Sequence, residues 1–242
     1  MNTQYFNDRK PAPWILIAMF LAAILASSSS CVLQRGRNFG HWAQSGEKID
    51  LIRYSIPAPE PKMPDNITIA ILPAISDMPQ PYLNTLNNNL LQQSRVYVPA
   101  NILEVDPDGK LKAYMTKDNL MPIAGVFNSQ EVGRLGRILG ASHVLCCHVQ
   151  NYRLDPPQIL SLHFILVDTG SFKTVTEMTA DFDASEQVTA ITLDRYLRSR
   201  SNRPYNITNL DIILRSPSQY SAFVAAECMF SFAERLWKRQ KN

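Results

Sequence analysis

The sequence predicts an α/β fold: a mixed sheet with an antiparallel meander, and helices packed on it. Three observations lead to this prediction. They are a short β-branched apolar run at 67–72, three consecutive strand patterns between 143 and 183, and amphipathic helix patterns before and after those strands. A sheet with an apolar face needs helices to cover it, and these patterns supply them.

The first strand pattern, residues 67–72, is rich in isoleucine and stops at Pro73. A helix is predicted at 81–93, because leucines recur on one face and proline is tolerated in the first turn. A short second strand is predicted at 95–98. Residues 99–128 contain a turn at 106–109 and otherwise read as a long loop or an inserted hairpin.

The next helix is predicted to begin at Ser129, which can cap it, with Glu131 in the first turn. Its apolar side chains share one face, formed by Val132, Leu135 and Leu139. Gly140 then stands where a helix often ends in a left-handed residue. The pattern therefore predicts a helix over about 129–139.

The meander is predicted as strands at 143–152, 159–168 and 172–183. Two consecutive prolines, at 156 and 157, separate the first two strands. The turn at 168–171 joins the last two, and Gly170 occupies the position that demands a positive φ. Short turns between successive strands favour antiparallel pairing.

Two helices are predicted to close the chain, one at about 186–198 and a longer one from Pro217 to about residue 238. The apolar face of the longer helix is predicted to pack on the meander and to complete the core; it consists of Phe223, Ala226, Phe230, Ala233 and Trp237. A docking face for a partner or a second copy of the chain is the alternative. The basic stretch at 198–204 is expected to be a solvated loop, with contact to anionic headgroups as the alternative.

The N-terminus carries the pattern of a secretory signal. Arg9 and Lys10 precede an unbroken apolar run from Trp14 to Ala26, and four serines separate this run from Cys31. The run is short for a spanning helix, which needs about 20 apolar residues. An uncleaved anchor helix and plain secretion are the alternatives.

The cysteine after small residues resembles the lipobox of bacterial lipoproteins. The resemblance implies cleavage before Cys31, lipidation of its thiol, palmitate included, and a mature protein outside the cytoplasm that is held to a membrane by this anchor. The sequence departs from the lipobox at Ser28, where that family usually has leucine.

The sequence divides into three parts. We expect a signal peptide at 1–30, an extended tether at 31–65 that ends in a proline-rich run, and a single α/β domain at 66–242. The alternative for 49–56 is an edge strand of that domain.

Composition limits the classes of function. The net charge of +3 over 242 residues is too small and too scattered to indicate nucleic-acid binding. The content of 45% hydrophobic and 19% charged residues is typical of a globular domain. Four cysteines are present, and lipidation of Cys31 leaves an odd number. At least one thiol is then free or paired between molecules.

One cluster suggests a metal: Cys146 and Cys147, with His143 and His148 nearby. Adjacent residues of a strand point to opposite faces, so the two thiols diverge. Packed core cysteines are therefore expected, with zinc as the alternative. Cys228 could form a disulfide with one of them.

The remaining polar residues also favour structural roles. His163 lies among apolar residues and is expected to be a hydrogen-bonded strand histidine, and Asp181 and Asp183 to be a solvated strand end. The sequence contains no nucleophile-elbow, phosphate-loop or zinc-protease motif. We therefore expect no catalytic, cofactor-binding or metal-binding residue, no cofactor and no enzymatic activity.

Four stretches together resemble a family of bacterial envelope domains: IAILP at 69–73, LGASHVL at 139–145, VDTG at 167–170 and RSP at 215–217. They are similar to the periplasmic domain shared by CsgG-like lipoproteins, LpoB-type activators of peptidoglycan synthases and the TolB N-terminal domain. The resemblance covers about 66–183 and extends more loosely to 238. These motifs specify a fold and are not catalytic.

The resemblance implies a lipid-anchored, non-enzymatic interaction or assembly module that faces the periplasm. Its partner would be another envelope component whose identity the sequence does not name, and an oligomer is compatible with it. Because Val32 rather than aspartate follows Cys31, the resemblance implies the outer membrane, with the inner membrane as the alternative.

Two other functions stay open. The first is a subunit of a CsgG-like outer-membrane secretion or assembly complex. The charged residues, proline and glycine at 106–118 argue against membrane-inserting hairpins in this chain. The second is an envelope hydrolase without a recognisable motif.

Overall fold

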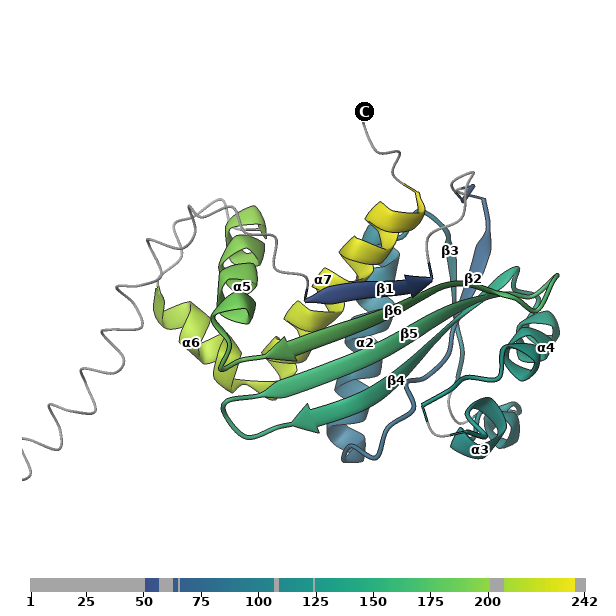
Figure 1. Cartoon of the computed structure of the whole chain (residues 1–242), viewed down its shortest axis with the longest axis horizontal. Helices are drawn as coiled ribbons and strands as arrows, with labels where there is room; N and C mark the ends of the chain where they lie inside the picture. The colour runs from purple at the N-terminus through teal and green to yellow at the C-terminus, as the bar shows by residue number, and fades with distance from the viewer. Residues whose placement is uncertain are drawn as a thin grey trace, which may run out of the picture. The chain divides into compact units, whose positions relative to one another are not determined.

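The computed structural model describes residues 51–56, 63–64, 66–106, 109–123, 125–200 and 207–237. Its centre is a six-stranded mixed sheet with the strand order β1-β6-β5-β4-β2-β3 (Figure 1). The strands are β1 Ile52–Ile56, β2 Thr68–Ile71, β3 Asn101–Glu104, β4 His143–Arg153, β5 Ile159–Asp168 and β6 Thr174–Asp183. The α/β fold class predicted from the sequence is confirmed.

The meander β4-β5-β6 is antiparallel, as the sequence predicts. Its register places Phe164 of β5 opposite Cys147 of β4 and Met178 of β6. On the other side of β4, β2 pairs in parallel, and β3 pairs in parallel with β2. Long-range parallel pairing and local antiparallel pairing therefore meet at β4.

Two long helices cover one face of the sheet: α2, Gln80–Tyr97, and α7, Pro217–Leu236, which also pack against each other. The ring centroids of Phe182 on β6 and Phe223 on α7 lie 5.5 Å apart and pack edge to face. Cross-strand partners share a face, so Phe164, Met178 and the Cys147 side chain lie on this same side. None of the described helices is long and apolar enough to cross a membrane.

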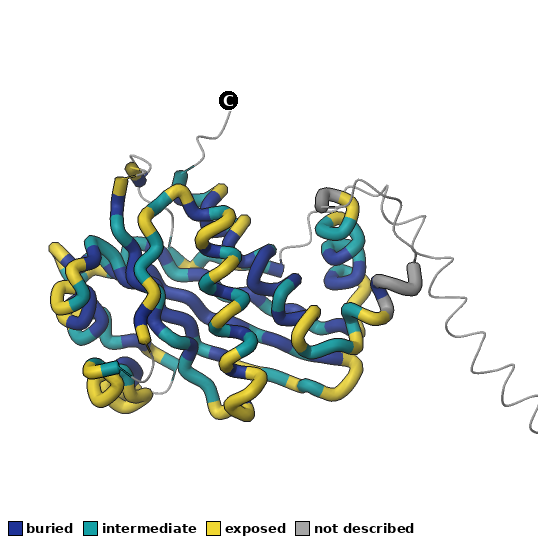
Figure 2. The backbone as a smooth tube through the Cα atoms, turned by 180° about the vertical axis from the view of Figure 1, so that it is seen from behind, coloured by how far each residue is buried: buried dark blue, intermediate teal, exposed yellow. Residues whose placement is uncertain are grey.

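The opposite face is covered beside β4 and β5 by α4, Ser129–Leu139, with α3, Lys117–Leu120, packed next to it. Val132 and Leu135 of α4 join a buried cluster with Val144 of β4 and Val167 of β5. In Figure 2 the buried stretches concentrate in the central strands and in the helix turns that face them. The core is thus divided by the sheet into two layers.

The smaller elements lie at the ends of the domain. Helix α5, Gln187–Arg200, and helix α6, Ile207–Arg215, contact α7, and a short 3-10 helix, η1, Lys112–Tyr114, precedes α3. The sequence analysis did not predict α6. Its nine residues fall directly after a polar stretch, and they are too few to display a sustained period.

Both ends of helix α4 are determined by residues next to it in the chain. Its N-cap is Asn128, whose Oδ1 accepts from the backbone N–H groups of Gln130 and Glu131. The prediction of Ser129 as the cap is therefore wrong by one residue. Gly140 ends the helix at φ 70°, which confirms the predicted left-handed terminus.

The predicted strand at 95–98 is wrong, because α2 continues through Tyr97. Ser94 is fully buried; its hydroxyl lies 2.7 Å from the carbonyl of Leu90 and 3.0 Å from the sulfur of Met229 on α7. Packing against α7 therefore holds these residues in the helix despite their β-branched pattern. The strand comes later, as β3, and the rest of the described part of 99–128 is the predicted loop, interrupted by the short elements η1 and α3 and without a hairpin of strands.

The prediction of an extended tether at 31–65 is wrong for residues 52–56, which belong to the sheet. Residues Ile52–Ile56 form β1, which pairs antiparallel with β6 at the sheet edge, as the alternative interpretation proposed. Arg53 forms an ion pair with Asp181, and the Tyr54 hydroxyl lies 3.0 Å from Ser231 Oγ on α7. The signal peptide, Cys31 and the rest of the tether up to residue 50 lie outside the described residues.

The turn between β5 and β6 also differs from the prediction. The residue with positive φ is Phe172, at 59°, and Gly170 is not among the residues with positive φ. The ring of Phe172 packs under the guanidinium of Arg137, 3.9 Å from the ring centroid, and next to Gly133 on α4. This contact with α4 compensates a left-handed conformation that an aromatic residue rarely adopts.

Helix α7 packs on the core as predicted, but with a broader face than the predicted one. Phe223, Ala226 and Ala233 are buried as predicted, but Phe230 is 39% exposed and contacts the ring of Tyr97 edge-on. The buried residues that the prediction omitted include Tyr220, Val224, Cys228, Met229, Phe232 and Leu236. The helix is buried on more than one side because α2 and the sheet both contact it.

We predict that Phe232→Ala lowers the free energy of unfolding by about 3–5 kcal/mol, because a fully buried aromatic ring leaves a cavity. Phe230→Ala is the matched control on the same helix; its ring is 39% exposed, and we expect a loss of about 1 kcal/mol. Chemical unfolding followed by circular dichroism measures both. Equal losses in the two variants would contradict the assignment of the buried face.

Candidate functional site

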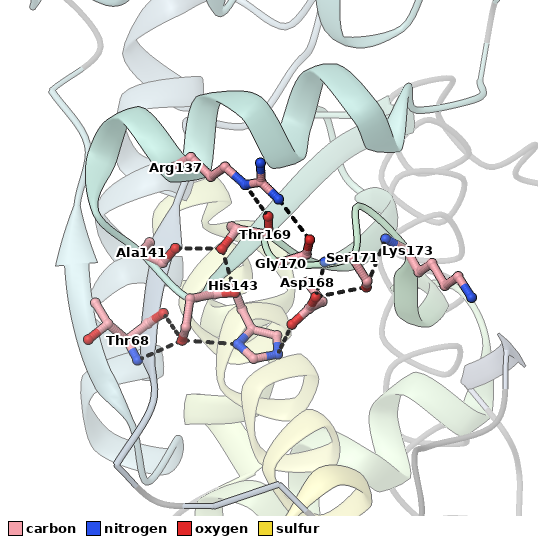
Figure 3. A network of polar contacts seen from close by, with 10 residues as sticks. Thr68, Arg137, Ala141, His143, Asp168, Thr169, Gly170, Ser171 and Lys173 are labelled. Carbon is pink, nitrogen blue, oxygen red and sulfur yellow. Dashed lines mark hydrogen bonds and ion pairs between the residues drawn. The ribbon is translucent and has the colours of Figure 1, made fainter.

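A polar network joins the end of α4 to the turn between β5 and β6 (Figure 3). The guanidinium of Arg137 donates to the carbonyl oxygens of Thr169 and Gly170, each at 2.7 Å. The Thr169 hydroxyl lies 2.8 Å from the carbonyl of Ala141 and 3.0 Å from that of Ser142. The network connects the start of β4 to the turn that ends β5.

In the same network the side chains of a serine, a histidine and an aspartate contact one another in this order. Ser142 Oγ lies 3.1 Å from His143 Nδ1, and His143 Nε2 lies 3.6 Å from Asp168 Oδ2. Residues of these types can form a hydrolytic triad when the histidine can accept the serine proton. The position of the serine proton therefore decides what this cluster can do.

The hydroxyl of Ser142 bridges to β2. It donates to the carbonyl oxygen of Thr68 at 2.9 Å and accepts from the Thr68 N–H at 3.1 Å. A hydroxyl has one proton, so His143 Nδ1 can bond to Ser142 only as a donor. The imidazole is then not placed to take the serine proton, and the geometry is that of a structural joint between β2, β4 and the β5–β6 turn.

Two pKa shifts accompany this joint. Burial lowers the pKa of His143 below its ordinary value, and the neighbouring Asp168 carboxylate offsets the effect only in part. Burial alone would raise the pKa of Asp168, but hydrogen bonds from the backbone and hydroxyl of Ser171 outweigh it, and the pKa is lowered. His143 is thus kept neutral and Asp168 charged.

The cysteines occupy the core. Cys146 belongs to the cluster under α4, and Cys147 faces α2 and α7, so the two side chains diverge as predicted. Cys228 is buried in α7, and all three thiols are free. Burial raises the pKa of each thiol, which keeps it protonated and poorly nucleophilic. Among the described residues, no group of three or more histidine, cysteine and acidic side chains could hold a metal.

The other polar residues from the sequence analysis are held by local partners. His163 is 5% exposed, and its Nε2 lies 2.8 Å from Glu177 Oε1 on β6. This confirms the prediction of a hydrogen-bonded strand histidine. Asp181 pairs with Arg53, and the Asp183 carboxylate accepts from the backbone N–H of Ser185 at 2.7 Å. The two carboxylates therefore have separate partners.

The topology indicates where a ligand would bind. The chain leaves β2, crosses one face through α2 to β3, and returns on the opposite face through α4 to β4, on the other side of β2. In open α/β sheets, ligands bind outside the carboxyl ends of the strands at such a reversal of strand order. Here that position is the segment after β2, beside the far end of β4.

Polar groups from several elements meet at this position. Asp77, after β2, lies 3.4 Å from Lys117 Nζ on α3 and accepts at its carbonyl from the Tyr152 hydroxyl at 3.2 Å. His148 of β4 is bridged to Ile75 in the same segment. Its pKa is lowered by burial first, and then by the positive charge of Lys117 and by His163. His148 is therefore neutral near pH 7.

A cavity of about 20 Å³ lies at the same end of the sheet. It is enclosed by the segment before α2 and the first turns of that helix, by the ends of β4 and β5, and by the first turn of α7. The lining residues are Met78, Tyr82, Thr85, Leu86, Arg153, Leu154, Gln158, Ile159, Leu160, Pro217, Tyr220 and Ser221. Carboxylate, imidazole and thiol groups are missing from this lining.

Two lining residues carry buried polar atoms with no hydrogen-bond partner: Tyr220, at its hydroxyl, and Gln158, at its Nε2 amide. Each residue is 2% exposed. The sequence analysis singled out neither of them. The two residues are far apart in the chain, so no local pattern brings them together.

No protein-family model and no curated protein matches the chain. Several solved structures show a likeness, among them three bacterial proteins. The PelC dodecamer from Paraburkholderia phytofirmans has a TM-score of 0.47 at 13% identity, covering 78% of this chain and 98% of that one. Lipoprotein GNA1162 from Neisseria meningitidis has a TM-score of 0.37 at 16% identity, covering 57% and 99%. TolB from Acinetobacter baumannii has a TM-score of 0.27 at 10% identity, covering 62% and 31%.

These proteins are bacterial, one is named as a lipoprotein, and TolB belongs to the resemblance drawn from the sequence. All three TM-scores lie below 0.5, so the likeness supports no conclusion about function. Membership of the CsgG-like group stays a prediction.

We predict that the protein loses stability as the pH falls below about 6.5, the ordinary pKa of histidine. The pKa values of His143 and His148 are lowered in the folded state, so the unfolded chain binds more protons in this range. His148→Gln should make the free energy of unfolding less dependent on pH between about 7 and 5. Asp168 contributes only at lower pH, because its pKa lies below 3.8. Chemical unfolding at a series of pH values checks this, and an unchanged slope in the variant would refute it.

Proposed function

We propose that this chain is a lipid-anchored protein of the bacterial envelope that binds another envelope component without catalysing a reaction. The observation that carries the proposal is the N-terminal pattern, in which Arg9 and Lys10, the apolar run Trp14–Ala26 and four serines precede Cys31. A single lipid chain gives only marginal membrane binding, so a stable anchor needs more than one. The lipobox resemblance implies such an anchor at Cys31.

Binding is favoured over catalysis by the polar groups of the domain. The proton of Ser142 is donated to Thr68, so the neighbouring His143 cannot activate this serine as a nucleophile. The cavity near the carboxyl ends of β2 and β4 offers hydrogen-bond donors and apolar walls, but no general base. Such a lining suits recognition of a ligand.

We predict that Cys31→Ala abolishes incorporation of labelled palmitate and moves the protein from the membrane fraction to soluble or unprocessed forms. The cause is the loss of the thiol to which lipid is attached. Ser28→Leu is the matched variant; it restores the usual lipobox residue and should keep or increase processing. Metabolic labelling followed by fractionation measures both. Equal labelling of the Cys31→Ala variant would rule out the anchor.

We also predict that the mature protein resides at the outer membrane and faces the periplasm, because Val32 rather than aspartate follows Cys31. Density-gradient separation of the two membranes tests this expectation. Val32→Asp is the informative variant, since it should move the protein to the inner membrane. Wild-type protein found only with the inner membrane would contradict the sorting rule for this chain.

A further inference from the structure

We propose that the cavity between α2, α7 and the β4–β5 hairpin binds an uncharged amide group, such as a peptide bond of a partner protein, through its carbonyl oxygen. The Tyr220 hydroxyl and the Gln158 amide are the two donors for this oxygen. The inference deepens the proposed binding function and rests on it. The experiment measures binding in the cavity and is independent of the lipid anchor. The amide site and the proposed function can therefore fail separately.

The first argument is the hydrogen-bonding state of these two side chains. Buried polar groups in folded proteins nearly always have a partner, and a group without one indicates an absent water, ion or ligand. Tyr220 and Gln158 are each 2% exposed, line the same cavity and leave a donor unpaired. The Gln158 nitrogen can only donate and the Tyr220 hydroxyl can donate, so an acceptor is the partner that suits both.

The second argument is size. The cavity holds about 20 Å³, and one water-sized group needs roughly 10–15 Å³. A single carbonyl oxygen therefore fits inside the cavity. Tyr82, 41% exposed, and Arg153 mark the side on which the cavity opens to solvent. The rest of the ligand would extend past these two residues.

The third argument is charge. The walls are largely apolar and include Met78, Leu86 and Leu160. Burial raises the pKa of Tyr220, and the negative charges of Asp183 and Glu186 raise it further, so the hydroxyl keeps its proton and acts as a donor. The same carboxylates repel an anion, and Arg153, the one charged residue of the lining, donates its Nε to the carbonyl of Pro157. An uncharged amide satisfies both donors without this repulsion.

The position agrees with the topology. The cavity lies beside the segment after β2 and the end of β4, where strand order reverses. Ligand sites of open α/β sheets lie outside the carboxyl ends of strands at such a point. Chemistry and fold therefore indicate the same site.

The test uses full-length protein in detergent solution, labelled with ¹³C in the methionine methyl groups. N-methylacetamide is the probe for the amide group, and the Met78 signal, assigned with Met78→Leu, reports on the cavity. We expect a saturable shift of this signal. The methyl of Met178, fully buried on β6 and not part of the lining, should stay unshifted.

Two tyrosine variants form a matched pair. Tyr220→Phe removes the buried donor and keeps the ring, and should abolish the Met78 shift while leaving the melting temperature unchanged or higher, because the hydroxyl lacks a partner in the unbound protein. Tyr82→Phe removes a hydroxyl at the exposed rim and should preserve the shift. Acetate, which matches the probe in shape but carries a charge, should bind at least several-fold more weakly.

Three results would overturn the proposal. One is a Met78 signal that the amide does not shift in the wild-type protein. Another is a shift that persists in Tyr220→Phe, or acetate binding as tightly as the amide. The third is a clear fall in the melting temperature of Tyr220→Phe, which would mean that a permanently bound water already pairs with the hydroxyl.

Discussion

The burial of strand β5 on both faces is the constraint on which the rest of this domain depends. From Leu162 to Val167 each residue of β5 is buried, and this strand lies between β4 and β6. One face needs α2 and α7, and the other needs α4 with α3. A strand covered on both sides reads as a continuous apolar run, because alternation is lost when neither face meets water. The two helix layers follow from covering this strand on both faces.

Several polar groups of this domain are paired at joints between elements. Thr169, Ser142 and Arg137 connect backbone groups of separate elements, and His163 meets Glu177 within the sheet. These bonds position structure, although the Nδ1 of His163 stays buried without a hydrogen-bond partner. Tyr220 differs because its hydroxyl is buried with no partner in a residue that lines a cavity. Because its polar groups are paired within the protein, the serine–histidine–aspartate cluster has a structural role. The cavity has unpaired donors and is suited to binding.

Local patterns were sufficient for the elements whose neighbours in sequence are also their neighbours in space. The meander strands β4 to β6 and the left-handed end of α4 agree with the predictions, since short turns and helix ends are determined within a few residues. The end of α2 was predicted as a strand, because Arg95–Val98 is β-branched in part; contact of Ser94 with Met229 on α7 decided otherwise. The candidate site was not predictable, because Gln158 and Tyr220 are brought together only by folding.

The sequence by itself determined the fold class, the order of the main elements, the placement of Cys146 and Cys147 on opposite faces and the signal-like N-terminus. The tertiary structure decided that Ile52–Ile56 is an edge strand, that Phe232 and not Phe230 enters the core, and that a donor-lined cavity lies between the N-terminal turns of α2 and α7. The physical reason is the distance along the chain over which each interaction acts. Propensity, periodicity and capping act over a few residues, whereas burial and hydrogen-bond pairing depend on segments that meet only when the chain is folded.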